Sequence, residues 1–94
     1  MNIRLTSNSW GGGDNTATLR DAIRTNAALG ILCIAAAGND GLNNDQYPFY
    51  PASYGESNMI VVAATDSSDN LAYFSNYGNA VSYTHLTLPT ILRV

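Results

Sequence analysis

The chain has 94 residues, of which 46% are apolar and only 12% are charged, and its net charge is −3 at pH 7. Such a chain is one small globular domain or part of a larger one. Its four basic residues are scattered arginines, so it offers no basic surface for nucleic acid. One cysteine excludes an internal disulfide and a cysteine-based zinc site. There is no apolar run of about 18 residues that would span a membrane.

The N-terminal part of the chain predicts a strand followed by a helix. Residues 1–8 alternate loosely between apolar and polar side chains, which is typical of a strand, and the glycines of residues 11–13 end it. Apolar side chains then recur at helical spacing from Ala17 until Gly30, which is a natural C-cap. The candidate N-caps of this helix are Asp14, Asn15 and Thr16.

Two later segments are wholly apolar. Residues 31–37 are bounded by glycine, which is typical of a strand buried on both faces of a parallel sheet, and residues 59–64 have the same character. Strand, helix and strand in this order form one right-handed βαβ unit. Residues 38–54 form a long polar and aromatic loop, and such a loop in a compact domain usually carries function. Turns are predicted at residues 66–70 and 75–78.

The ends of the first two predicted strands form the candidate functional region. Both strands run parallel, so residues 9–12 and 36–39 should leave the sheet at the same edge and face each other across a cleft. Asn39 has two side-chain N–H donors and stands beside a glycine, so it could donate to an oxyanion formed during acyl transfer. The alternative is a turn asparagine that caps its own backbone, and spacing alone favours this alternative.

Five short motifs are spread along the chain. They are Ser7-Asn8-Ser9-Trp10-Gly11-Gly12, Ile34-Ala35-Ala36-Ala37-Gly38-Asn39, Tyr50-Pro51-Ala52-Ser53-Tyr54, Val61-Val62-Ala63-Ala64-Thr65-Asp66 and Phe74-Ser75-Asn76-Tyr77-Gly78. In order and spacing they resemble the landmarks of the subtilase family of serine proteases, and the resemblance covers residues 3–80. It implies a three-layer α/β fold with a mostly parallel sheet, of which this segment is the central part.

The resemblance implies that Asn39 is the oxyanion-hole asparagine and that two segments form the walls of the P1 pocket for an extended polypeptide. In that family the backbone of the first wall also pairs with the substrate as an added β-strand. The wall residues are Ser9, Trp10 and Gly11 on one side and Ala36, Ala37 and Gly38 on the other. Ordinary core packing is the alternative for Trp10 and the alanines. Phe49 lies where the family's loop closes the pocket, which suggests a restriction to small P1 side chains, or a loop aromatic packed on the core.

No organic cofactor and no metal site is expected from the residues of this segment. Some subtilases hold calcium near the region that Asp66 and Asp69 match. Calcium takes about six to eight oxygen ligands, so two aspartates are few for such a site. Capping of their own turn is the alternative role, and calcium elsewhere in the parent domain stays open.

The resemblance places the catalytic triad outside this segment. The family's aspartate and histidine motifs precede the position of Asn8, and its Gly-Thr-Ser motif follows residue 80. His85 lacks the glycines of the histidine motif, so the segment alone is expected to be inactive. Residues 1–80 are expected to be a partial subtilase domain whose partner is the rest of the parent domain. Residues 81–94 resemble translated sequencing-adapter read-through and are expected to be a non-native tail, a divergent natural tail being the alternative.

The leading interpretation is therefore a fragment of a secreted serine endopeptidase, with the location inferred from the family alone. A catalytically dead module that binds extended peptides by strand addition is the alternative, although exposed apolar surface on part of a parallel sheet argues against it. A third interpretation is a small flavodoxin-like domain with a phosphate loop at residues 11–13. No basic residue directly follows these glycines, which argues against a phosphate loop.

Overall fold

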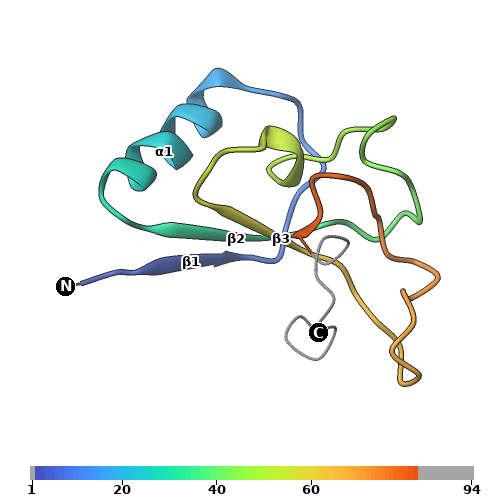
Figure 1. Cartoon of the computed structure of the whole chain (residues 1–94). Helices are drawn as coiled ribbons and strands as arrows, with labels where there is room; N and C mark the ends of the chain where they lie inside the picture. The colour runs from blue at the N-terminus through green and yellow to red at the C-terminus, as the bar shows by residue number, and fades with distance from the viewer. Residues whose placement is uncertain (1, 83–94) are drawn as a thin grey trace.

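The computed structural model describes residues 2–82, which form a three-stranded sheet with one long helix packed on it (Figure 1). The elements are β1 (Leu5–Asn8), α1 (Ala17–Ala28), β2 (Leu32–Ala36), the short 3₁₀ helix η1 (Ala52–Tyr54) and β3 (Met59–Val62). The strands lie in the order β1-β2-β3, and both neighbouring pairs are parallel. The predicted α/β class with a parallel sheet is therefore confirmed.

Two side chains fix the N-terminus of α1. Thr16 is the N-cap, and its hydroxyl accepts a hydrogen bond from the Leu19 N–H at 3.4 Å. The Tyr54 hydroxyl of η1 accepts from the Thr16 N–H at 3.0 Å and donates to the Thr16 carbonyl at 3.1 Å. The segment before β3 therefore holds the start of the helix in place.

Gly30 ends α1, as the sequence predicted. Its φ of +73° is left-handed, a conformation that glycine adopts without steric cost. The Gly30 N–H donates to the Ala27 carbonyl at 3.0 Å, and the Ile31 N–H donates to the Asn26 carbonyl at 2.9 Å. These two bonds form a Schellman motif, which turns the chain from the helix directly into β2.

Two buried apolar clusters hold the helix and the loops on the sheet. The first joins α1, β2 and η1 through Ile23, Cys33 and Tyr54. Burial raises the pKa of the Cys33 thiol, so it stays protonated at neutral pH and packs as an apolar side chain. The second cluster, called the alanine cluster, consists of Ala37, Ala52, Val61, Ala63 and Val81.

β2 is buried on one face only, which corrects the expectation that both its faces are buried. Cys33 and Ala35 are buried, whereas Leu32 is 41% exposed and Ile34 and Ala36 are half-buried. Side chains alternate between the faces of a strand, and α1 and η1 lie together on the same face of the sheet (Figure 1). The opposite face, the open face, carries the apolar side chains of Leu5, Leu32, Ile34, Ile60 and Val62.

The last described residues join the core. Val81 is fully buried in the alanine cluster, and the Ser82 hydroxyl accepts a hydrogen bond from the Val61 N–H at 3.1 Å. The predicted non-native tail lies, from residue 83 onward, outside the described residues, and its boundary stays a prediction. No helix in residues 2–82 is both long and apolar enough to cross a membrane.

Candidate functional site

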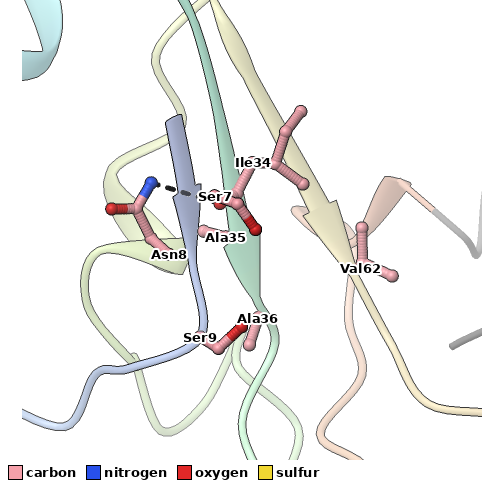
Figure 2. A pocket seen from close by; sticks show the side chains of 7 residues that line it. All are labelled: Ser7, Asn8, Ser9, Ile34, Ala35, Ala36 and Val62. Atoms are coloured by element: carbon pink, nitrogen blue, oxygen red, sulfur yellow. Dashed lines mark hydrogen bonds between the residues drawn. The ribbon is translucent and has the colours of Figure 1, made fainter. Parts of the chain in front are cut away.

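The ends of β1 and β2 lie side by side, as predicted. Asn8 pairs with Ala35 in the parallel register, so Ser9 and Ala36 leave the sheet at the same edge. Both residues line one pocket of about 260 Å³, and Figure 2 shows them next to each other at the ends of β1 and β2. The other residues that line this pocket are Ser7, Asn8, Ile34, Ala35 and Val62.

The Asn8 side chain joins these two strand ends. Its Nδ2 donates to the Ile34 carbonyl at 3.2 Å, the bond that Figure 2 draws as a dashed line, and to the Thr6 hydroxyl at 3.0 Å. This amide therefore holds β1 and β2 in register just before the two loops that carry the predicted site.

Asn39 stands beyond the end of β2 and is exposed to solvent. It follows Gly38, whose φ is +116°. Within residues 2–82 the Asn39 side chain has no hydrogen-bond partner, so it does not cap its own turn there. Its two N–H donors are therefore available, within residues 2–82, to a group that lies beyond the end of β2.

The predicted wall residues differ in burial. Residues 9–11 are all exposed, and Trp10, at 53%, is not a core residue within the described part of the chain. Ala36 lines the pocket, whereas Ala37 is buried in the alanine cluster and Gly38 is buried beside it. Core packing, the alternative for these positions, is therefore observed for Ala37 and not for Trp10.

The ring of Phe49 lies between the two predicted walls. A Cβ atom added to Gly11 would lie 2.5 Å from Phe49 Cε2, and one added to Gly38 would lie 3.2 Å from Phe49 Cδ2. Phe49 also packs against the alanine cluster, as expected for a loop aromatic on the core. The same ring thus lies against both walls, at positions where glycine leaves room for it.

Two buried asparagines, which sequence reasoning missed, hold the loop after β2. Asn76 Oδ1 accepts from the N–H groups of Asp40 and Leu42, at 2.9 and 3.1 Å. Asn76 Nδ2 donates to Asn44 Oδ1 at 3.0 Å, and Asn44 Nδ2 donates to the Ala37 carbonyl at 2.9 Å. The partners of the Asn76 side chain lie 32 to 36 residues away, so no local pattern marks it as more than a turn residue.

Asp66 caps its own turn, as the sequence suggested. Its Oδ1 accepts from the N–H groups of Ser68 and Asn70, at 2.8 and 3.1 Å. Across residues 2–82, no three side chains of the types Asp, Glu, His and Cys come together as a metal site would need. The expectation of no cofactor, with calcium in the parent domain left open, stays a prediction.

Comparisons with known proteins identify the family. The model of the subtilase family, peptidase S8, matches residues 1–91. Thermitase of Thermoactinomyces vulgaris is 39% identical over 93 residues, which cover 93% of this chain and 32% of thermitase. Subtilisin-like protease 2 of Pseudogymnoascus destructans is 41% identical over 70 residues, which cover 74% of this chain and 16% of that protein. The solved structure of the psychrophilic subtilisin-like protease Apa1 of Pseudoalteromonas sp. AS-11 matches with a TM-score of 0.71 and 41% identity, over 83% of this chain and 17% of that one.

The chain belongs to the subtilase family, and its parallel sheet and helix have the subtilisin-like α/β fold. It spans less than a third of the length of the two curated relatives. His85, which was set aside as a catalytic base, lies outside the described residues.

Proposed function

We propose that this chain is a segment of a subtilisin-like serine endopeptidase, in which Asn39 donates a hydrogen bond to the oxyanion of the tetrahedral intermediate. When a serine hydroxyl attacks a scissile carbonyl, negative charge develops on the carbonyl oxygen, and a fixed N–H donor stabilises that charge. The observation that carries the proposal is the exposed Asn39 amide, which has no partner in residues 2–82 and stands beyond the end of β2.

The substrate in this proposal is a polypeptide in extended conformation. Its P1 side chain enters between residues 9–11 and residues 36–38, and the rest of the parent domain supplies the nucleophile, the base and the orienting acid. The exposed backbone of residues 9–11 supports this proposal, because strand addition needs backbone groups that the substrate can reach. Because the nucleophile, the base and the orienting acid lie elsewhere in the parent domain, the segment alone is inactive in this proposal. Family membership supports a location outside the cell.

The first experiment is to determine the full reading frame and to express the full-length protein. Asn39→Ala is expected to lower kcat on a peptide substrate by roughly 100- to 1000-fold, because one oxyanion donor is lost. Asn15→Ala, at an exposed asparagine in the loop before α1, is the matched control and should leave kcat unchanged.

Two results would overturn the proposal. An Asn39→Ala enzyme with unchanged kcat would remove Asn39 from the reaction. A full reading frame without a Gly-Thr-Ser motif and a histidine motif would exclude proteolysis. In that case, binding of extended peptides by a catalytically dead module becomes the function to test.

A further inference from the structure

Asn39 is held only through its neighbours in the chain. Its side chain is exposed and has no hydrogen-bond partner in residues 2–82, so nothing there fixes it directly. An oxyanion donor must nevertheless stand at a defined place, since a misplacement of about 1 Å can cost about 100-fold in rate. The groups that fix the backbone on either side of Asn39 therefore decide whether its amide can work.

Asn76 fixes the backbone on both sides. Before Asn39, the Gly38 carbonyl accepts from the Asn76 N–H at 2.9 Å. After Asn39, the N–H groups of Asp40 and Leu42 both donate to Asn76 Oδ1, at 2.9 and 3.1 Å. One residue thus holds the peptide groups that flank Asn39, and three hydrogen bonds leave this loop little freedom to shift.

Asn76 is itself fixed, because it is almost fully buried and both polar atoms of its amide group form hydrogen bonds. It is 1% exposed, and its Nδ2 donates to Asn44, which is 4% exposed and reaches back to the Ala37 carbonyl. Gly38 shows how tightly the two segments fit, since a Cβ atom added there would lie 3.0 Å from Asn76 Cγ. Buried polar networks in which every group is satisfied are rigid, which suits a support for a reacting group.

We infer that Asn76, supported by Asn44, is a positioning residue that holds Asn39 where its amide can donate to the oxyanion. The inference rests on the proposed function of Asn39. It adds an asparagine that is distant in sequence and that acts on Asn39 through the backbone of residues 38–42, without a role in contacting the substrate. Truncation of Asn76 should therefore act on the rate of the chemical step and leave substrate binding largely intact.

The test is a double-mutant cycle in the full-length protein, with kcat and KM measured on one peptide substrate. Asn76→Ala is expected to lower kcat by about 10- to 100-fold with little change in KM. In the Asn39→Ala background the same substitution should cost no further kcat, because the donor that it positions is already absent. The inference would be overturned if the kcat losses of Asn39→Ala and Asn76→Ala added in the double variant. It would also be overturned if Asn76→Ala left kcat unchanged.

Asn58→Ala is the matched control for a merely structural effect. Asn58 is also a buried asparagine, and its Nδ2 donates to the carbonyls of Ile23 and Ile31 at 3.1 and 2.9 Å, away from residues 38–42. It should keep kcat, and an equal kcat loss there would overturn the inference. If Asn76→Ala does not fold, Asn44→Ala replaces it in the cycle. We expect a smaller kcat loss, again absent in the Asn39→Ala background, and no loss would overturn the inference.

The same cycle separates the two proposals. An unchanged kcat in Asn39→Ala overturns the proposed function and, with it, the positioning role. A large loss in Asn39→Ala together with no loss in Asn76→Ala and Asn44→Ala overturns the positioning role alone.

Discussion

At the scale of single residues, Phe49 lies between the two predicted walls of the candidate site. Its ring lies against Gly11 on one wall and Gly38 on the other, and it is anchored on the alanine cluster. A large P1 side chain would need the space that this ring occupies. We therefore expect the full-length protein to cleave after small side chains, and Phe49→Gly to raise kcat/KM for P1 Phe relative to P1 Ala by at least about 10-fold.

Cleavage of a peptide series that varies only at P1 measures this ratio. The matched control is Tyr47→Gly in the same loop, because Tyr47 is 58% exposed and should not affect the ratio. A wild-type protein that already prefers aromatic P1 residues would show that Phe49 does not close the pocket.

A position can require glycine because of its backbone conformation or because a side chain would clash there, and Gly38 and Gly30 distinguish these two reasons. Both have a positive φ, +116° and +73°, so alanine at either position costs about 1–2 kcal/mol of backbone strain. A Cβ atom at Gly30 would meet no atom within 4 Å, whereas one at Gly38 would crowd Asn76 and Phe49. Gly38→Ala should therefore destabilise the full-length protein by about 1–3 kcal/mol more than Gly30→Ala, measured by urea unfolding. Equal losses would mean that the loop moves away from the new methyl group.

Sequence reasoning succeeded at single residues where the cause is local. Gly30 was predicted as the C-cap and Thr16 as one of three candidate N-caps, because a cap needs only its own neighbours in the chain. Asn76 was missed because its role depends on partners that only the folded chain brings near it. The place of Asn39 at a strand end was predicted, but spacing alone favoured a self-capping turn, and no such bond forms within residues 2–82.

At the scale of elements, Glu56 connects α1 to the segment before β3. Its Oε1 accepts from Arg20 Nε at 2.7 Å and from Arg24 Nε at 2.9 Å. The hydrogen bond from Arg20, followed by that from Arg24, holds the pKa of the Glu56 carboxyl below its ordinary value. A lowered folded-state pKa stabilises the fold above the unfolded-state value of about 4.3, and this contribution is lost as the pH falls through the folded-state pKa.

Glu56→Gln should therefore reduce the stability of the full-length protein at neutral pH and leave the variant less sensitive to acid. Thermal unfolding measured from neutral pH to about pH 3 gives both quantities. Asp14→Asn is the control, since Asp14 is exposed and forms no ion pair within the described residues. A parallel loss of stability with acid in wild type and Glu56→Gln would show that the two ion pairs do not act in the folded protein.

The strands and α1 were predictable because each depends on a run of the sequence, whereas η1 lies within the predicted loop of residues 38–54. Apolar runs predicted β2 and β3, and helical spacing predicted α1. The expectation that both faces of β2 are buried was wrong. An apolar run predicts a strand, but it does not tell whether other residues of the same segment cover one face of that strand or both. Leu32 is apolar and yet 41% exposed, since α1 and η1 lie on the other face.

At the scale of the whole molecule, the open face is the feature that residues 2–82 leave unexplained. Leu5 and Leu32 are 52% and 41% exposed, and Ile34, Ile60 and Val62 are only half-buried. Contiguous exposed apolar surface favours association with another surface. Since the chain spans less than a third of its relatives' length, we expect further parts of the full-length protein to cover this face.

This expectation gives Ile34→Thr opposite effects in two contexts. Threonine keeps the β-branched shape that suits a strand but exchanges an ethyl group for a hydroxyl. In the isolated segment, residues 1–82, the change should raise the soluble fraction, because it interrupts an exposed apolar face. In the full-length protein it should lower stability by about 1–3 kcal/mol, because a polar group is then buried without a partner.

Ile23→Thr is the control on the α1 face, where Ile23 is 6% exposed, and it should lower both the soluble fraction of the segment and the stability of the full-length protein. If Ile34→Thr were neutral in the full-length protein, the open face would stay exposed there, and a surface of that kind would favour the peptide-binding module over the enzyme.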